Sequence, residues 1–450
     1  MSKMVTKNKA IIIGGSIAGK LAARVLSDFA EEVIIVEKDP KCEQRLPRTS
    51  VPQGFHGHAL LKSGEEALEE LFPGIVDELI ADGAVPSDFA SELSWYHHGS
   101  WKVQFKSGVS IIQQSRPFLE EHIQRRLELI PNISFQYETK VKGVVVKENR
   151  AIGVTLTTKN GNISDLFADI VVDASGAGSA TPRWLKELGL GVPPKTEVKV
   201  DLFYSSRKYR SLSPKNGGSL LIYPNPPIQN LGGAIAKIEN NEWMVTLLGY
   251  GVKHPPFNDE QFINYTKQLD DQGIYDTIKD ADPVTPVSFY RFPSLSRYHY
   301  DNMKHFPDGL IVIGDAFSRI NPVFAQGMSI AALEALALKK ELSKWEGSPG
   351  KHLSKKIHRR FSRITDIPWL IALSEDFRFK TTSGKKPFGL PFLQWYVKKV
   401  VTACSLNTEV YGQFIKVLHL KAHPITLFSP KMMLKIFASV KKAIIYKNRN

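Results

Sequence analysis

Residues suited to binding phosphate groups lie in a glycine-rich turn near the N-terminus. The turn follows the apolar, β-branched run Ala10–Ile13 and holds Gly14, Gly15, Ser16 and Gly19. Glycines let the backbone approach a pyrophosphate closely, and a helix that follows such a turn directs its N-terminal N–H groups at the phosphates. Glu37 lies 18 residues beyond Gly19, where a carboxylate can accept hydrogen bonds from the hydroxyls of an adenosine ribose. The spacing predicts a dinucleotide-binding turn, with a plain tight turn as the alternative.

The elements around this turn are predicted to be strand, turn, helix and strand. Leu21–Phe29 carries apolar residues at helical spacing, and Val33–Val36 is a second buried strand that ends at Glu37. Ser16 stands where the pattern G-x-G-x-x-G has its second glycine. Serine is small enough to permit the close approach that this pattern requires.

Two further buried strands are predicted to end in turns of the same kind. Ile170–Val172 runs into Asp173–Gly176, and Leu310–Ile313 runs into Gly314 and Asp315. Short apolar runs of this type are typical of parallel strands that are buried on both faces. With the N-terminal strands they predict one sheet assembled from segments far apart in the sequence, and therefore a discontinuous domain.

The third turn carries groups that suit a flavin. Asp315 can hold a ribityl hydroxyl, and the segment from Asn321-Pro322 to Gln326-Gly327-Met328 opens a helix predicted over Ser329–Leu342. The positive end of that helix dipole would stabilise negative charge on a reduced flavin. The alternative is an ordinary loop that ends in a capped helix.

Composition limits the class of protein. The 450 residues predict two or three domains. A formal charge of +14 favours anionic partners such as a phosphorylated cofactor, acidic lipid or nucleic acid, or else reflects a solvated basic surface. Two cysteines, Cys42 and Cys404, exclude a disulfide scaffold, a Cys-based zinc site and an iron–sulfur cluster. No apolar stretch approaches the ~20 residues that span a bilayer, so we expect a cytoplasmic protein that is free or rests on a membrane surface.

The middle and the end of the chain differ from the N-terminal part. Residues 188–300 hold alternating segments, such as Val198–Tyr204 and Trp243–Leu248, which predict an antiparallel sheet with one exposed face. From about residue 330 the pattern is helical. The helices are predicted to break at Pro368, Pro387, Pro391, Pro424 and Pro430.

Taken together, the three turns resemble those of the FAD-dependent monooxygenases of the aromatic-hydroxylase and squalene-epoxidase type. The resemblance is closest to bacterial FAD-dependent oxidoreductases, which include epoxidases of polyether biosynthesis. Further segments that resemble this family are Val51–His58, Ser115–Glu120, Pro182–Trp184, Asn321–Met328, and Trp369 with Glu375–Arg378. The resemblance therefore covers nearly the whole chain.

The strand pattern and the resemblance together imply an α/β fold with three parts. A discontinuous Rossmann-like FAD-binding domain would comprise residues 1–75, 111–187 and 301–345. An inserted, mainly antiparallel-sheet substrate domain would comprise residues 76–110 and 188–300, and a C-terminal helical region would comprise residues 346–450.

The resemblance also implies which residues bind FAD. These are Gly14, Gly15, Ser16, Ala18, Gly19, Glu37, Lys38, Arg48, Arg116, Asp173, Gly176, Gly314, Asp315, Pro322, Gln326, Gly327 and Met328. The first turn would hold the pyrophosphate, with Glu37 on the adenosine ribose and Asp173 and Gly176 beside the adenosine and pyrophosphate. Asp315 would bind ribityl and phosphate oxygens, and Pro322–Met328 would flank the isoalloxazine. Relatives usually have glycine where this chain has Ala325.

The reaction that the resemblance implies is oxygen insertion. NAD(P)H, bound transiently, would reduce the flavin, and a flavin C4a-hydroperoxide would hydroxylate or epoxidise a lipophilic or aromatic small molecule. The flavin carries the difficult chemistry, so we assign no catalytic acid or base. The alternative is a reductase or desaturase that acts on a prenyl chain. A halogenase of this fold should carry a Trp-x-Trp-x-Ile-Pro segment, and no two tryptophans here are two residues apart.

Other side chains allow more than one interpretation. His56 and His58 could share one face of a strand and bind a metal, but no further ligand is clustered with them, so we expect them to line the loop near the flavin and expect no metal site. Trp95, Trp101 and Trp243 could belong to the core or to a substrate pocket. No nucleic-acid-binding module and no obligate protein partner is evident.

The C-terminal residues 431–447 predict an amphipathic helix. Met432, Met433, Ile436, Phe437, Val440, Ala443 and Ile444 share one face, and lysines lie opposite. The helix could pack on the protein itself or form a peripheral contact with an acidic membrane that admits a lipophilic substrate.

Overall fold

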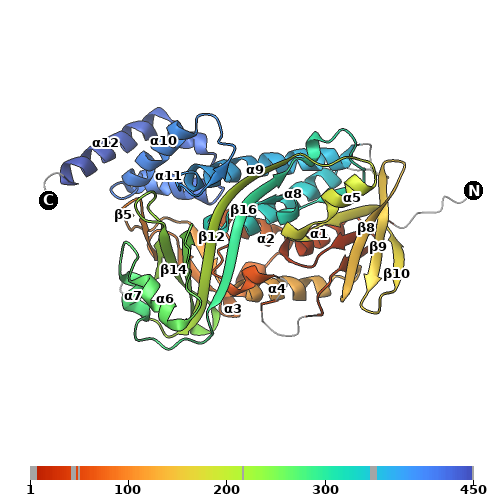
Figure 1. Ribbon diagram of the computed structural model, residues 1–450, viewed down its shortest axis with the longest axis horizontal. Helices are drawn as coiled ribbons and strands as arrows, with labels where there is room; N and C mark the ends of the chain where they lie inside the picture. Colours follow the sequence, from red (N-terminus) through yellow and green to blue (C-terminus); the bar gives the residue numbers. More distant parts are fainter. Residues whose placement is uncertain (1–7, 42–46, 49–50, 215–216, 345–351, 448–450) are drawn as a thin grey trace, which may run out of the picture.

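A five-stranded parallel sheet forms one end of the molecule, on the right in Figure 1. The computed structural model describes residues 8–41, 47–48, 51–214, 217–344 and 352–447. The sheet has the order β17-β11-β1-β2-β7 and comprises β17 (Leu310–Val312), β11 (Ile170–Asp173), β1 (Lys9–Ile13), β2 (Glu32–Val36) and β7 (Ile133–Gln136). The discontinuous parallel sheet predicted from the sequence is therefore confirmed.

Helices enclose this parallel sheet. They are α1 (Ile17–Leu26), α2 (Lys62–Leu71), α3 (Ile75–Ala81), α4 (Arg116–Glu128), α5 (Thr181–Glu187) and α8 (Gly327–Leu342). Helix α1 packs against α4 and α8, and a core of isoleucine, leucine, valine and alanine side chains fills the space between the helices and the strands. Helix α1 begins at Ile17, earlier than the periodicity of Leu21–Phe29 predicts, because the glycine turn leads directly into it. A three-stranded sheet of β8 (Thr139–Lys147), β9 (Arg150–Thr158) and β10 (Ile163–Phe167) lies beyond.

A second, larger sheet forms the other half. Its order is β18-β16-β12-β15-β14-β13-β4-β5, with β19 (Ser383–Gly384) paired to β12. Its strands are β18 (Ser318–Arg319), β16 (Ser288–Tyr298), β12 (Lys195–Arg210), β15 (Glu242–Tyr250), β14 (Leu231–Lys237), β13 (Ser219–Ile222), β4 (Leu93–His97) and β5 (Ser100–Trp101). The pairing is antiparallel except between β13 and β4. A short ribbon joins β3 (Val85–Asp88) to β6 (Ser110–Gln113).

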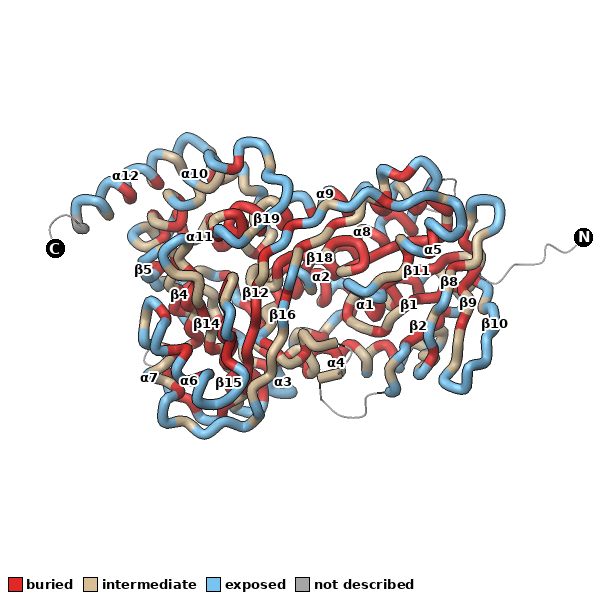
Figure 2. Tube along the Cα trace, viewed as in Figure 1, coloured by how far each residue is buried: buried red, intermediate tan, exposed pale blue. Residues whose placement is uncertain are grey.

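The prediction that this sheet exposes one face holds only for part of it, because buried and exposed residues alternate in the first part of β12 but not along β15. Eight of the nine residues of β15 are buried in succession, and the buried path along β12 and β15 is visible in Figure 2. Helices α6 (Asp259–Thr266) and α7 (Gly273–Ile278) pack over Phe203 and Val245. Trp369, from the C-terminal helices, packs with Val198 and Leu248. In this part of the sheet both faces are covered by elements remote in sequence, so alternation along a strand does not by itself predict which residues are exposed.

The C-terminal helices are α9 (Leu353–Asp376), α10 (Leu390–Ala403), α11 (Thr408–Leu418) and α12 (Pro430–Lys447). The predicted break at Pro368 is wrong, because Pro368 lies within α9. An interior proline costs a helix ~3 kcal/mol, and the burial of Pro368, Trp369 and Ala372 on the large sheet offsets that cost. Pro391 and Pro430 do lie at the starts of α10 and α12. In the part of the chain that the structure describes, no helix is both long enough and apolar enough to cross a bilayer.

A buried carboxyl group connects helix α8 to the turn that follows β17. Glu334 has no exposed surface, and its Oε2 accepts a hydrogen bond of 2.8 Å from the Gly314 N–H. Burial raises the pKa of Glu334 from 4.5 to about 8, and the nearby Asp315 adds to the rise. Glu334 therefore holds the Gly314 turn mainly as a neutral carboxyl group at pH 7.

Replacing Glu334 by glutamine should change how stability depends on pH. In the FAD-free protein the folded state keeps a proton on Glu334 up to about pH 8, whereas the unfolded chain releases it near pH 4.5. The stability that this group contributes is full below pH 4.5 and is lost as the pH rises to about 8. We expect Glu334→Gln to gain stability relative to the wild type between pH 5 and pH 8, by up to about 1.4 kcal/mol per pH unit. Urea unfolding at several pH values measures the difference. Exposed Glu187→Gln is the control, and a wild-type-minus-variant difference independent of pH would contradict the expectation.

Candidate functional site

The three turns that follow β1, β11 and β17 enclose a groove of about 590 Å³, here called the turn groove. Strand pairing brings the turns together: the Ala174 N–H donates to the Ile13 carbonyl, and the Ile313 N–H donates to the Asp173 carbonyl. The predicted site residues that line this groove are Gly14, Ser16, Ala18, Glu37, Lys38, Arg116, Gly176, Gly314, Asp315, Pro322, Gly327 and Met328. Residues from four separate parts of the chain thus meet in one place.

The first turn has the backbone shape that a bound pyrophosphate requires. Gly14 has a φ of +98°, and a Cβ at this position would lie 2.8 Å from the Ala174 carbonyl oxygen. Gly19 has a different reason to be glycine, because its Cβ would lie 1.9 Å from the Gly14 carbonyl oxygen. Gly19 therefore permits α1 to pack against the turn and does not line the groove. The cradle fits a pyrophosphate at the N-terminus of α1, where backbone N–H groups are free to bind anions.

A network of charged side chains surrounds the N-terminus of α1. Arg116 donates to the Ser16 hydroxyl at 2.9 Å and to Glu120 at 2.8 Å. Arg48 donates to Glu37 and to Glu120, each at 3.1 Å. Gly15 and Arg48 line a neighbouring cavity of about 380 Å³ that shares Glu37 and Arg116 with the turn groove. The two arginines are thereby held in place beside the groove.

Glu120 is the centre of this network, and sequence reasoning assigned it no role. Burial opposes its charge, but Arg116, Lys20 and Arg48 together hold the pKa of Glu120 at about 2. Its spacing of four residues from Arg116 on one helix is the signal that could have identified it.

Glu37 also has a structural function, because its Oε2 accepts the Gly15 N–H at 2.8 Å. This bond connects the end of β2 to the glycine turn.

Besides Gly15, Gly19 and Arg48, two further predicted residues, Asp173 and Gln326, do not line the turn groove. Asp173 is fully buried and accepts hydrogen bonds from the Ser175 N–H at 2.9 Å and the Thr181 hydroxyl at 2.6 Å. It therefore shapes the second turn, and the neighbouring Gly176 lines the groove. Gln326 is also buried and faces a second cavity.

Asp315 and Ala325 lie at the far end of the turn groove. Burial raises the pKa of Asp315, and the positive charges of Arg319 and Arg116 oppose the rise. Ala325 has a φ of +53°, a left-handed conformation that costs a residue with a Cβ about 1–2 kcal/mol. This strain gives a physical reason why glycine suits the position.

The second cavity, of about 500 Å³, lies between the large sheet and the C-terminal helices and is here called the apolar cavity. Its walls include Trp95, Leu248, Phe324, Ile371, Val400 and Phe414. The apolar cavity and the turn groove share His58, Ala59, Pro322 and Ala325. Trp95 thus lines a cavity, whereas Trp243 lies in the core beneath α6 and α7 and Trp101 is 37% exposed.

The two histidines of the 56–58 loop contact different parts of the molecule. His56 Nδ1 forms a hydrogen bond of 2.9 Å with the Ser206 hydroxyl, and His58 Nδ1 donates to the His56 carbonyl at 2.9 Å. Burial lowers the pKa of His56 to about 4 and that of His58 to about 3. Both rings are therefore neutral at pH 7, and His58 lies where the two cavities meet.

Sequence comparison finds flavoenzymes among the relatives, although no protein-family profile matches the chain. Protein Rv3254 of Mycobacterium tuberculosis is 27% identical over 407 residues, which cover 87% of this chain and 83% of that protein. Kynurenine 3-monooxygenase of Dictyostelium discoideum is 23% identical over 354 residues, covering 74% and 69% of the two chains. Squalene monooxygenase SE1 of Panax ginseng is 21% identical over 345 residues, covering 73% of this chain and only 57% of that enzyme.

Solved structures share the fold over most of the chain. The flavin-dependent brominase Bmp2 superposes with a TM-score of 0.68 at 15% identity, covering 99% of this chain and 100% of that one. PqsL of Pseudomonas aeruginosa, in complex with 2-aminobenzoylacetate, has a TM-score of 0.62 at 16% identity and covers 83% and 98% of the two chains. At these identities the likeness concerns the fold.

The parallel sheet with its three turns, the large sheet and the C-terminal helices define the α/β architecture of the flavin-dependent monooxygenases. Within that class the chain is homologous to squalene and kynurenine monooxygenases, and it is an FAD-dependent oxidoreductase of the monooxygenase type. The sequence-based prediction of family and fold is confirmed.

A valine at position 14 should abolish FAD binding. Its Cβ would collide with the Ala174 carbonyl, and a β-branched residue strongly resists a φ of +98°. We expect Gly14→Val to fold with native helix content but to lack flavin absorbance after purification. Gly143→Val is the matched control, because a Cβ there has open space and φ is not left-handed. Full flavin content in a folded Gly14→Val protein would show that this turn does not hold the cofactor.

Proposed function

We propose that this protein inserts one oxygen atom from O2 into a lipophilic small molecule, with FAD in the turn groove and the substrate in the apolar cavity. The observation that supports this most directly is the junction of the two cavities at His58, Ala59, Pro322 and Ala325. A reaction between a bound cofactor and a substrate needs such a junction, because the reacting atoms must come within about 3–3.5 Å.

The residues of the turn groove suit each part of FAD. Gly14, Ser16 and the N-terminus of α1 would bind the pyrophosphate, with Arg116 neutralising part of its charge. Glu37 would accept hydrogen bonds from the adenosine ribose, and Asp315 would form a hydrogen bond with the ribityl chain. Pro322–Met328 would border the isoalloxazine ring. Bound there, FAD would supply electron transfer from NAD(P)H and the activation of O2.

The protein's own residues would orient the substrate and exclude water. Helix α8 begins at Gly327 beside the junction, so its positive end would stabilise negative charge on the flavin pyrimidine. The apolar walls contributed by the large sheet and helices α9, α10 and α11 would keep water from the reacting atoms. A cavity of about 500 Å³ accommodates an aromatic or isoprenoid molecule of ordinary ligand size.

A reductase or desaturase acting on a prenyl chain remains the second candidate, because the same apolar cavity would hold an isoprenoid. The two reactions differ in the fate of oxygen. Only the monooxygenase transfers an oxygen atom of O2 to the substrate; a desaturase must pass two electrons to an acceptor, which can be O2, and a reductase takes them from NAD(P)H. The sequence has no second complete glycine motif for a stably bound nicotinamide, so NAD(P)H would bind transiently.

Narrowing the apolar cavity should separate product formation from flavin chemistry. Ala234 on β14 lines the cavity, and we expect Ala234→Trp to retain FAD and NADPH oxidation but to lose most product, because the indole occupies substrate space. The substrate is first identified by mass spectrometry of molecules that co-purify with the wild type. Incorporation of 18O from 18O2 is then measured with and without NADPH.

Exposed Ala81→Trp is the matched control for bulk. Product without 18O would favour the second candidate: a reductase if it also forms in the absence of O2 and requires NADPH, and a desaturase if it requires an electron acceptor. Unchanged product formation by Ala234→Trp would exclude the apolar cavity as the substrate site.

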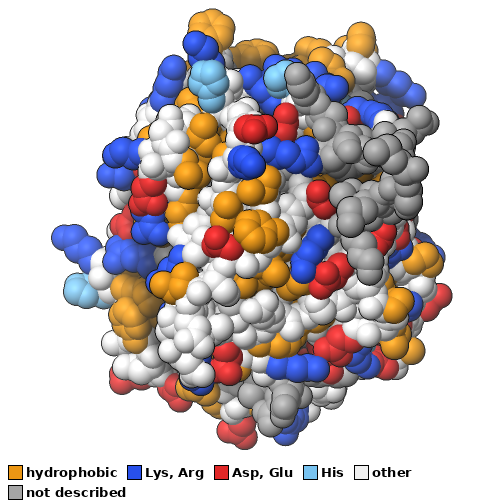
Figure 3. Space-filling view, turned by 90° about the vertical axis from the view of Figure 1, so that its right-hand side faces the viewer, with side chains coloured by type: hydrophobic (Ala, Val, Ile, Leu, Met, Phe, Trp, Pro, Cys, Tyr) orange, Lys and Arg blue, Asp and Glu red, His pale blue; other side chains and the backbone are white. Residues whose placement is uncertain are grey.

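We also propose that the C-terminal helices rest on an anionic membrane surface. Between Lys380 and Lys447 the chain has twelve lysines and a single acidic residue, Glu409. At the opposite end of the molecule, acidic and basic side chains are interspersed (Figure 3). Phe392 and Trp395 on α10 are 59% and 47% exposed. Aromatic and basic side chains on one surface are typical of interfacial binding.

Helix α12 divides its apolar residues between two contacts. Ile436 and Val440 are buried, with Ile436 in the core beside α10 and α11. Leu434 and Ile444 are 74% and 53% exposed, and the outer turns of α12 project from the molecule in Figure 2. Packing on the protein thus uses only part of the helix. The rim of the apolar cavity includes Ile425 and Phe428 from the same region, which would let a lipophilic substrate enter from the bilayer.

Vesicle binding tests this surface. We expect the protein to sediment with vesicles that contain anionic lipid, less so at high salt, because lysines attract the headgroups within a Debye length. Deletion of residues 431–450 and the double variant Leu434→Ser/Ile444→Ser should each weaken sedimentation. Leu129→Ser/Ile163→Ser is the matched control, because these side chains are 79% and 72% exposed but lie outside the C-terminal helices. Equal sedimentation of all four proteins would contradict the proposal.

A further inference from the structure

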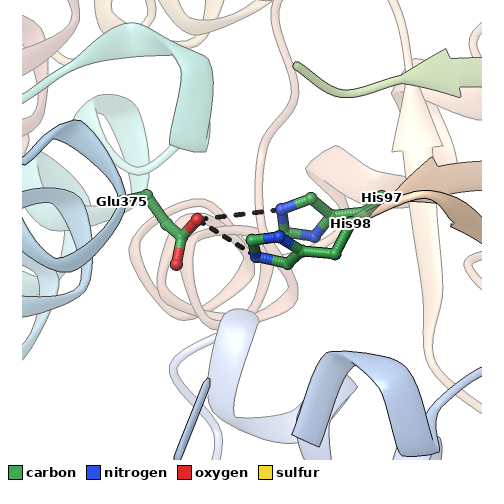
Figure 4. A group of neighbouring side chains, drawn as sticks. All are labelled: His97, His98 and Glu375. Atoms are coloured by element: carbon green, nitrogen blue, oxygen red, sulfur yellow. Dashed lines mark ion pairs between the residues drawn. The ribbon is translucent and has the colours of Figure 1, made fainter. Parts of the chain in front are cut away.

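Two adjacent histidines, His97 and His98, meet a glutamate that is remote in sequence, Glu375 (Figure 4). His97 and Glu375 line the apolar cavity. His97 is the last residue of β4, His98 begins the turn to β5, and Glu375 lies near the end of α9. The Glu375 Oε2 atom lies 3.8 Å from His97 Nε2 and 3.4 Å from His98 Nε2. One donor atom from each residue lies within 4.8 Å of the others.

The backbone at His98 is what places both imidazoles on one side. Consecutive residues of a strand point to opposite faces, but His98 has a φ of +50° and the following Gly99 has a φ of +74°. These values are those of a two-residue hairpin turn, in which asparagine and glycine are preferred. The His98 ring consequently stacks on the His97 ring, with centroids 4.3 Å apart and planes at 22°.

Three nitrogen atoms of the two imidazoles are buried and have no hydrogen bond among the described residues, although two of them lie within ion-pair distance of Glu375. The side chains of His97, His98 and Glu375 are 6%, 2% and 8% exposed. Neither ring nitrogen of His97, nor the Nε2 of His98, has a hydrogen bond within the described residues. Buried polar atoms are normally hydrogen-bonded, so three buried imidazole nitrogens without a hydrogen bond, next to a carboxylate, favour binding of a metal ion.

The carboxylate is oriented from its other side. Arg378 Nε donates to the Glu375 Oε1 atom at 3.0 Å, and Arg378 also donates to the Gln394 carbonyl at 2.6 Å. Oε2 is left facing the two imidazoles. Outer hydrogen bonds of this kind hold the ligating groups of metal sites in position.

We propose that His97, His98 and Glu375 bind a divalent transition-metal ion of the zinc class. Two imidazoles and one carboxylate form a donor set that Zn²⁺ and Fe²⁺ accept. Donor atoms about 2.1 Å from a tetrahedral ion lie roughly 3.4 Å apart, which the Glu375–His98 distance of 3.4 Å matches and the Glu375–His97 distance of 3.8 Å exceeds. Because the two rings are stacked, the imidazoles must turn for both Nε2 atoms to point at one ion. His97 and Glu375 line the apolar cavity, so the remaining coordination position would face it and take an oxygen atom of water or of a ligand.

Two cations lie close to this site and limit its affinity. Arg378 contacts the same carboxylate, and the Lys102 ammonium donates to the His97 carbonyl at 2.9 Å. Lys102 is itself surrounded by acceptors, which include the Val401 carbonyl and the Ser405 hydroxyl. Both positive charges repel a divalent ion, so we expect weaker binding than the same three ligands would give without them.

Calorimetric titration of the full-length, chelator-treated protein with ZnCl2 tests the site. We expect one Zn²⁺ per chain, and Co²⁺ in its place to give visible absorption bands of low-symmetry coordination. His98→Asn removes one ligand while keeping a residue that prefers the left-handed turn, and Glu375→Gln removes the anionic oxygen. Each variant should weaken Zn²⁺ binding at least tenfold and abolish the cobalt bands.

His352→Asn is the matched control, because His352 is an exposed histidine that also has a left-handed φ, of +69°. Thermal melting and flavin content of all four proteins establish that each is folded and loaded. The metal site does not depend on the oxygenase proposal, so intact flavin content with lost zinc binding separates the two. Absence of zinc binding in the wild type, or equal affinity in all four proteins, would overturn the proposal.

Discussion

The parallel pairing of β1 with β11, and of β11 with β17, is the constraint on which the rest of the site depends. Strands that run in the same direction end at the same edge, so three turns separated by more than a hundred residues each lie side by side. Backbone hydrogen bonds between the strand ends fix their separation, and Gly14 fits against Ala174 only because it lacks a Cβ. Every group that lines the turn groove takes its position from this edge, including the start of α8 beside Gly327.

In the proposed reaction, the second half of the molecule would supply the substrate side of the site. The large sheet and the C-terminal helices enclose an apolar cavity that opens on the groove at Pro322 and Ala325. Charge and apolar surface are separated: Arg48 and Arg116 gather around Glu120 near the N-terminus of α1, and the apolar walls lie beyond Pro322 and Ala325. Polar groups within the apolar cavity are few, and His97 and Glu375 belong to the small set that could specify what it binds.

Much of the turn groove could be predicted because its residues act through local backbone chemistry. Gly14, Ser16, Glu37 and Asp315 follow directly on buried strands, and a strand that ends in a glycine or acidic turn is recognisable in one sequence. Other features of the site could not be predicted, because the hydrogen-bond partners and the cavity that a buried side chain faces are not recorded in a local pattern. Asp173 accepts hydrogen bonds from the hydroxyl groups of Ser175 and Thr181 in its own turn, and Gln326 lines the apolar cavity. Pro368 lies inside a helix because the large sheet buries it.

The sequence by itself determined the strands, the glycine turns, the amphipathic end of the chain and the flavin-dependent class, because each depends on neighbours within a few residues. The tertiary structure alone decided which faces are buried, how the two cavities join, and that His98 and Glu375 meet. Those features depend on contacts between segments up to several hundred residues apart, and no local pattern records them. In an extended strand His97 and His98 would point to opposite faces, and only the left-handed turn at His98 places both imidazoles on one side. Such conformations form because the packing free energy, summed over many contacts, outweighs the local conformational preference of a single residue.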